Sequence, residues 1–170
     1  MDGNNILAVL DAGPLIHLDE LACLSFLDDF DAVLVPKAVL AEALKHRPDL
    51  PLHQLARVEI VSQSPPLGEE LQRLADRFAL HAGERSALAV LQARGGSFLL
   101  SDDAAARAVA EAVGFQTHGT VGVILRMFRR RRISRENMLA LLRDLPARTS
   151  LHLRVDFLDA IIAKATAESA

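Results

Sequence analysis

The sequence contains five acidic side chains whose types and spacing could do chemistry together: Asp11, Glu42, Glu84, Asp102 and Asp103. Carboxylates gathered in one cleft repel one another, so a cluster of this kind predicts a bound cation. Their oxygens suit Mg²⁺ or Mn²⁺, hard ions that prefer oxygen ligands and keep several waters. An ion held in this way can activate a water molecule for hydrolysis.

Most of these acids also have a purely structural explanation. Glu84, Asp102 and Asp103 fall in the predicted first turns of helices, where an acid gains ~0.3–1 kcal/mol from the helix dipole. Glu42 can pair with a basic residue three or four positions further along its helix. Asp11 is different, because it follows a buried strand and would bear a costly charge unless something binds it.

The elements that must position these acids follow from the hydrophobic pattern. Short apolar runs predict strands at 6–10, 32–35, 58–61, 97–100 and 115–117. Helical spacing between and after them predicts helices at 14–27, 37–46, 68–81, 83–94, 102–113, 120–131, 134–145 and 155–167. We expect Pro14 near the start of the first helix and Ser101 as the cap of the helix from 102.

This alternation predicts an α/β fold, a three-layer α/β/α sandwich with a central, mainly parallel sheet. Ligands of such sheets bind beyond the carboxyl ends of the strands. Asp11 directly follows the first strand, and Asp102 and Asp103 follow the fourth. We therefore expect the acids to meet at one edge of the sheet.

Composition limits the class of protein. The 170 residues suit one domain, predicted over 1–146, with a helical extension over 147–170 packed on that domain or at an oligomer interface. With 19 basic and 22 acidic residues, the net charge of −3 indicates no polyanion partner by itself. Cys23 is the single cysteine, and no run reaches the ~20 apolar residues of a membrane span, so a cytoplasmic location is expected.

The order and local strings of the acids resemble those of the PIN domain, a fold of metal-dependent ribonucleases. The similar segments are Asp11-Ala12-Gly13-Pro14-Leu15-Ile16, Val35-Pro36 leading to Glu42, Gly83-Glu84-Arg85-Ser86-Ala87-Leu88-Ala89, Leu99-Leu100-Ser101-Asp102-Asp103 with Arg107, and Thr117-His118-Gly119-Thr120-Val121-Gly122. Two departures occur. Gly13 stands where a polar residue is usual, and Glu84 replaces the more usual Asp.

The resemblance implies an endoribonuclease that uses Mg²⁺ or Mn²⁺. It makes Asp11, Glu42, Glu84 and one or both of Asp102 and Asp103 the metal-site carboxylates, with Asp11 and Asp103 favoured as direct ligands and Glu42 and Glu84 bound directly or through water. It also implies RNA as substrate and the toxin half of a toxin–antitoxin pair as context, with a small antitoxin as partner. A homodimer, or a complex with the small antitoxin, is expected to use the apolar stripe around Leu158 and Ile162.

A run of arginines adds a second feature with two explanations. The run comprises Arg126, Arg129, Arg130, Arg131, Arg132 and Arg135. It is either a solvated helix end, where cations suit the negative dipole, or a surface that contacts the RNA backbone, for which Arg126 to Arg132 are the candidates. A catalytically inactive PIN-like protein that binds nucleic acid or a protein partner remains the alternative to the nuclease.

Overall fold

The chain folds around one parallel sheet of five strands. The computed structural model describes residues 6–167. The strands are β1 (Leu7–Leu10), β2 (Ala32–Pro36), β3 (Val58–Val61), β4 (Phe98–Leu100) and β5 (Gln116–His118), in the order β3-β2-β1-β4-β5. β1 and β4 pair in register, Leu10 opposite Leu100, so the residues after these strands emerge side by side. The predicted parallel sheet is confirmed.

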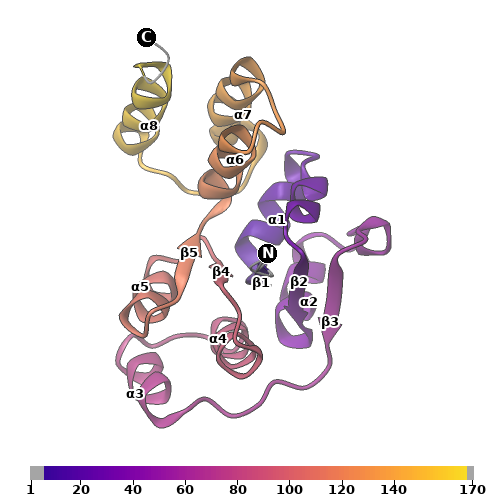
Figure 1. The fold of residues 1–170 in the computed structure, drawn as a ribbon, viewed down its shortest axis with the longest axis vertical. Coiled ribbons are helices and arrows are strands. Elements are labelled where there is room, and N and C mark those ends of the chain that lie inside the picture. Colours follow the sequence, from indigo (N-terminus) through magenta and orange to yellow (C-terminus); the bar gives the residue numbers. More distant parts are fainter. Residues whose placement is uncertain (1–5, 168–170) are drawn as a thin grey trace, which may run out of the picture.

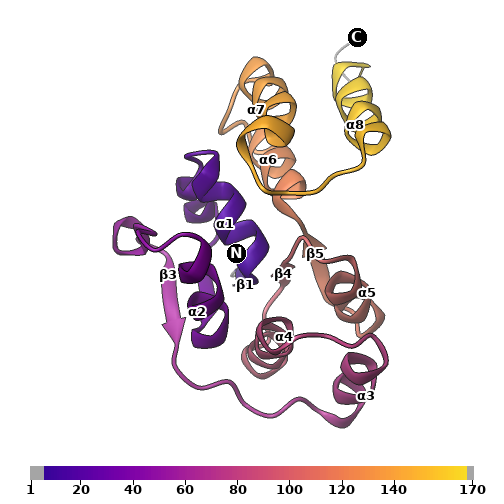
Figure 2. The same cartoon turned by 180° about the vertical axis from the view of Figure 1, so that it is seen from behind.

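Helices cover both faces of this sheet. They are α1 (Ala12–Glu20), α2 (Lys37–His46), α3 (Glu69–Arg77), α4 (Ala82–Arg94), α5 (Ala104–Ala112), α6 (Thr120–Arg129), α7 (Arg135–Arg148) and α8 (Val155–Ala167), with short 3-10 turns at Leu24–Asp29 and Leu52–Gln54. Figures 1 and 2 show α1, α6 and α7 on one side of the sheet and α3, α4 and α5 on the other. The fold is therefore the predicted three-layer α/β/α sandwich.

The core lies between these layers. The central strands are almost wholly apolar and buried, as expected for a parallel sheet covered on both faces. Val9, Leu34 and Leu99 are at most 1% exposed, and Leu88 and Leu91 of α4 pack against the same cluster. This packing fixes where each strand ends, and hence where the acids stand.

The C-terminal segment differs in part from the expectation. The predicted boundary at residue 146 falls inside α7, which continues to Arg148 past Pro146. In α8, Leu158 is buried and Ile162 is half-buried against the core, so the predicted oligomer stripe packs partly within its own chain. Val155 and Phe157 are the exposed apolar side chains at the start of this helix. Within residues 6–167 no helix is both long and apolar enough to cross a membrane.

Candidate active site

Asp11 lies at the carboxyl end of β1 and occupies the N-cap position of α1. The helix begins at Ala12, earlier than the sequence predicted, yet the Asp11 side chain makes no capping hydrogen bond. Instead, Oδ2 of Asp11 accepts a hydrogen bond of 2.7 Å from the Ser101 hydroxyl, which is fully buried. Burial raises the pKa of Asp11 to about 6 against the hydrogen bonds it accepts, and the nearby charges of Glu84 and Glu42 raise it further.

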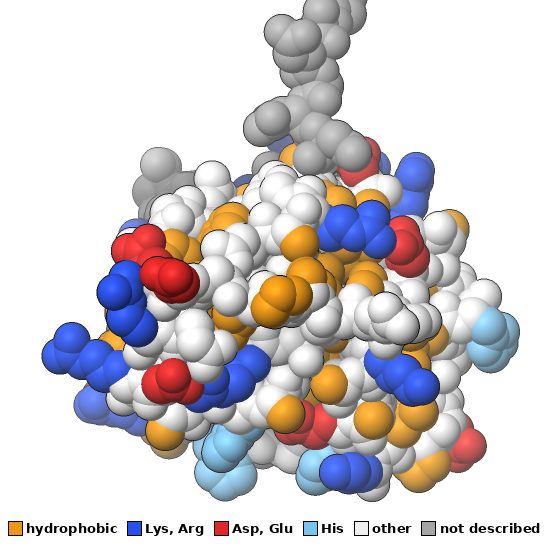
Figure 3. Space-filling view, turned by 90° about the horizontal axis from the view of Figure 1, so that it is seen from below, with side chains coloured by type: hydrophobic (Ala, Val, Ile, Leu, Met, Phe, Trp, Pro, Cys, Tyr) orange, Lys and Arg blue, Asp and Glu red, His pale blue; other side chains and the backbone are white. Residues whose placement is uncertain are grey.

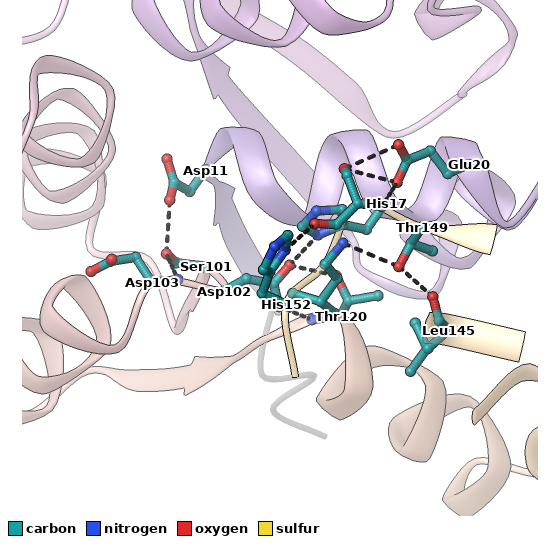
Figure 4. A network of polar contacts seen from close by, with 12 residues as sticks. Asp11, His17, Glu20, Ser101, Asp102, Asp103, Thr120, Leu145, Thr149 and His152 are labelled. Atoms are coloured by element: carbon teal, nitrogen blue, oxygen red, sulfur yellow. Dashed lines mark hydrogen bonds and ion pairs between the residues drawn. The ribbon is translucent and has the colours of Figure 1, made fainter. Parts of the chain in front are cut away.

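Ser101 connects two of the predicted acids. We expected it to cap the helix after β4, but its hydroxyl instead donates to Asp11 and accepts from the backbone N–H of Asp103 at 3.1 Å. Asp103 caps α5 itself, because its Oδ1 accepts from the N–H of Ala106 at 2.7 Å. Figure 4 shows Ser101 with Asp11 above it and Asp103 beside it.

Glu84 and Glu42 approach the same point from two helices. Glu84 lies in the first turn of α4, where Oε2 accepts from the backbone N–H of His81 at 2.6 Å in a capping box. Burial raises the pKa of Glu84 against that hydrogen bond, and the charges of Asp103 and Glu42 act in the same direction. Glu84 therefore lies close enough to Glu42 and Asp103 for their negative charges to raise its pKa.

Gly83 keeps open the space between Glu42 and Asp11. A Cβ at this position would lie 2.8 Å from Oε2 of Glu42 and 3.8 Å from Oδ1 of Asp11. A side chain there would fill the cradle between the two carboxylates. The glycine therefore leaves room for a small cation between oxygen ligands, which fits the hard ions expected from the sequence.

The structure brings four of the predicted acids to one edge, although it does not gather them tightly. The charges of Glu84 and Glu42 act on Asp11, and those of Asp103 and Glu42 act on Glu84. No three His, Cys, Asp or Glu side chains within residues 6–167 lie close enough to hold one ion together. The donor set fits Mg²⁺ or Mn²⁺, and the more distant carboxylates would bind through the waters that such ions retain.

Asp102 turns away from this group. Its Oδ2 lies 2.7 Å from Nδ1 of His17 and accepts from the Thr120 hydroxyl, while Oδ1 accepts from the Thr120 N–H at 2.7 Å. A Cβ at Gly13 would lie 3.2 Å from the Asp102 Cβ, and a Cβ at Gly119 only 2.6 Å from Oδ1. The glycine at position 13, where the sequence departs from the PIN pattern, thus leaves room for Asp102.

The arginine run lies at the opposite edge of the sheet. Arg126 lines a cavity of about 570 Å³ with Gly95, Gly96 and Ser97, which precede β4. Three of the run, Arg126, Arg130 and Arg132, pair with Asp29 at 2.8–3.3 Å, and the Asp29 side chain is 1% exposed. The guanidinium of Arg126 also lies over the rings of Phe30 and Phe98.

These contacts give part of the run a structural role. Arg135 donates to the carbonyl of Thr166, whereas Arg129 and Arg131 are exposed. The RNA contact predicted for the run stays a prediction. Figure 3 shows the face that carries α3 and α4, where basic and acidic side chains are interspersed rather than separated.

Sequence reasoning missed the partners that orient the acids. His17, Thr120 and Ser101 are all buried polar residues near the carboxyl edge. A signal existed for Thr120, because it follows Gly119 in one of the strings that resemble the PIN domain. No comparable signal marked His17, whose contact with Asp102 spans 85 residues of sequence.

A parallel α/β sandwich with acids at the carboxyl edge of its central strands defines a class of proteins that could hold metal ions there. A family model described as PIN domain matches residues 7–167, and the chain belongs to this family. This confirms the resemblance seen in the sequence, and the match includes most of the C-terminal segment. PIN domains are generally nuclease-like and use divalent metal ions.

Comparison with individual proteins adds little beyond the family. Among solved structures, the chain is similar to a PilT N-terminus domain protein from the hyperthermophilic archaeon Sulfolobus solfataricus P2. The identity is 15%, the TM-score is 0.44, and the match covers 88% of this chain and 98% of that one. No curated protein matches the chain.

Proposed function

We propose that the chain is a metal-dependent endoribonuclease that hydrolyses RNA phosphodiester bonds at the carboxyl edge of β1 and β4. One observation carries the proposal. The buried Asp11 carboxylate, with its pKa raised to about 6, faces an open cradle at Gly83 together with Glu42. A buried acid among like charges disfavours its own ionised form, and a bound divalent cation would reverse that penalty.

Each acid would bind the metal in a way that depends on its position. Asp11 and Asp103 would hold Mg²⁺ or Mn²⁺ directly, while Glu42 and Glu84 would hold it directly or through water. A bound ion would supply charge neutralisation at the attacked phosphate and would lower the pKa of a water molecule. Ser101 orients Asp11 by donating to Oδ2, which leaves Oδ1 toward the cradle, and it fixes the backbone of Asp103.

In this proposal Asp102 positions the site and does not touch the metal. It holds the loop after β4 against α1 through His17 and against α6 through Thr120. Since both of its oxygens already accept hydrogen bonds, a metal would have to displace them. The catalytic role expected for Asp102 from the sequence thus becomes a positioning role.

The alternative function is a PIN-like protein that binds nucleic acid or a protein partner without cutting. The observation in its favour is that no three acids within the described residues are close enough to share one ion. The two functions differ in metal dependence. A nuclease needs Mg²⁺ or Mn²⁺ for cleavage, whereas a binding protein would keep its RNA affinity unchanged when the metal is removed.

The biological context is a further part of the proposal. We propose a toxin that acts in the cytoplasm, is inhibited by a small antitoxin protein, and forms a homodimer. Light scattering of the purified chain tests the dimer, with twice the 18.5 kDa mass as the expected result. Co-purification with the product of an adjacent gene tests the antitoxin.

The direct test is cleavage of a labelled single-stranded RNA with Mg²⁺, with Mn²⁺ and with a chelator. Wild type should cleave only with metal, and Asp11→Asn should not cleave. Asp49→Asn is a matched control, because Asp49 is exposed in the loop after α2. Metal-independent cleavage, or normal cleavage by Asp11→Asn, would overturn the proposed function.

A further inference from the structure

A groove runs along the side of α5, with Asp102 at one end and α8 along one wall. Two adjoining cavities, of about 370 and 630 Å³, share the lining residues Asp102, Arg107, His152, Leu153 and Phe157. One wall comes from α5, β5 and the start of α6, and the other from residues 151–157 and α8. Ala104, which directly follows Asp103, also lines the groove, although the four acids of the candidate metal site do not.

Arg107 places a positive charge in this groove. It lies one helical turn after Asp103, and its guanidinium donates to the carbonyl of Ser101 at 3.0 Å. Among the described residues it forms no ion pair, whereas Arg126 and its neighbours at the other edge share Asp29. Its remaining N–H groups are therefore available to a phosphate beside the acids.

The acids that line the groove already have partners of their own. Asp102 accepts hydrogen bonds from Thr120 and contacts His17. Glu111 accepts from the Thr117 hydroxyl, and Asp156 pairs with Arg154 at 2.6 Å. Arg154 thus neutralises Asp156, and hydrogen bonds hold Asp102 and Glu111 in place. Arg107, which no carboxylate of the described residues pairs with, gives the groove a cation that can bind an anionic chain.

Phe157 gives the same groove an exposed aromatic ring. It lies in the first turn of α8 and is 51% exposed, in a chain that has seven Phe and neither Tyr nor Trp. An exposed apolar ring next to a cation is the combination that single-stranded nucleic acid binds, through stacking of a base and contact with a phosphate. Figure 4 places His152, from the loop before α8, near the Asp102 network that borders the groove.

We infer that this groove holds the RNA strand next to the cleaved bond, with Arg107 on a backbone phosphate and Phe157 stacked on a base. The inference rests on the proposed function and names where its substrate lies. It gives the C-terminal segment a role, because residues 151–157 form one wall of the groove. The segment then belongs to the substrate site and is more than a packing extension.

The test measures binding of a labelled single-stranded RNA to the full chain carrying Asp11→Asn. Fluorescence anisotropy reports the binding, and the titration is repeated across a salt series. Adding Arg107→Gln should weaken binding and flatten the slope of log affinity against log salt by ~0.7. Adding Phe157→Ala should weaken binding roughly 5- to 150-fold, the range for loss of one stacked base. Phe157→Leu keeps apolar bulk without the ring, so it should weaken binding as well.

Matched controls lie at the end of α3 and just after it, at residues that do not line the groove. Arg77 and Phe78 are both exposed, so Arg77→Gln and Phe78→Ala remove the same groups without touching the groove. These variants should bind RNA as the parent does. Equal losses in controls and groove variants would show a non-specific effect and overturn the inference.

The outcomes also separate this inference from the proposed function. If wild type cleaves RNA and the Arg107 and Phe157 variants bind and cleave normally, the groove is overturned and the nuclease stands. If the groove variants lose RNA binding but wild type shows no metal-dependent cleavage, the groove stands and the nuclease is overturned. Absence of RNA binding by the Asp11→Asn chain would overturn the groove.

Discussion

The two edges of the sheet hold charge in opposite ways. At the carboxyl edge, Asp11, Glu42 and Glu84 lie near one another and form no ion pair with a basic residue of the described part of the chain. The pKa of Asp11 rises to about 6 mainly because the group is buried. At the amino edge, the Asp29 side chain is also buried, but it pairs with three arginines that share its single negative charge. The comparison teaches that a cluster indicates a site when its charges remain uncompensated.

The largest expected effect is that of Asp11→Asn, which should abolish metal-dependent cleavage. It should also stabilise the metal-free fold at pH 7.5 by on the order of 1–3 kcal/mol, because the raised pKa means that the ionised carboxylate opposes folding. Thermal unfolding with and without metal measures both parts.

The raised pKa of Asp11 also makes the folding stability depend on pH. The folded-state pKa of about 6 lies above the ordinary value of 3.8, so the folded protein takes up a proton as pH falls through 6. The stability penalty of Asp11 is therefore full above pH 6 and lost toward pH 4. The stabilisation by Asp11→Asn should shrink over that window, and a constant difference would contradict the account.

At the opposite edge, Asp29→Ala should cost about 3–5 kcal/mol of stability, because it leaves the largely buried Arg126 without its counter-charge. Metal affinity should not change in protein that remains folded. Asp28→Ala is the control, since Asp28 is the exposed neighbour in sequence. Denaturant unfolding measures the effect, and equal small losses in both variants would remove the contrast between the edges.

Asp102 and Asp103 provide a contrast within one loop. Asp102→Ala should lower stability by about 1–3 kcal/mol, because the buried Thr120 N–H loses its acceptor. Asp102→Asn should recover part of that loss and retain metal affinity. Asp103→Asn should keep stability, since Asn also caps helices, but should weaken metal binding. If Asp102→Asn weakened metal binding and Asp103→Asn did not, Asp102 would be the ligand.

The smallest expected effect is at the arginine run. If the run bound RNA phosphates, changing Arg130 and Arg131 to Ala would flatten the slope of log RNA affinity against log salt by roughly 1.4. Because Arg130 already pairs with Asp29, we expect a loss nearer ~0.7 or less. A full loss would show that the amino edge binds RNA despite its ion pairs.

The fold and the edge that carries the acids were predictable because they depend on local patterns. Apolar runs defined the strands, and a residue that follows a parallel strand must stand at the carboxyl edge. The predicted start of α1 was wrong, because Pro14 is also accepted at the third helical position. The helix begins at Ala12, and Asp11 is its N-cap residue. Ser101 was wrongly assigned as the cap, because its bond to Asp11 joins residues 90 positions apart.

The roles of neighbouring charges were not predictable, because they depend on contacts between residues far apart in the sequence. Asp102 and Asp103 have almost identical local contexts, and only contacts with His17 and Thr120 separate them. The arginines appear as one run in the sequence, yet Arg126 meets Asp29 across 97 residues. Spacing shows which charges are available, whereas long-range pairing decides which of them remain uncompensated.

The most direct measurement is calorimetric titration of Mg²⁺ and Mn²⁺ into the metal-free wild type, Asp11→Asn and Asp102→Asn chains at pH 7.5. We expect binding by wild type and Asp102→Asn, loss of binding by Asp11→Asn, and proton release that grows as the pH approaches 6. No binding by wild type at millimolar metal, or equal binding by Asp11→Asn, would contradict the claim that the carboxyl edge is a metal site.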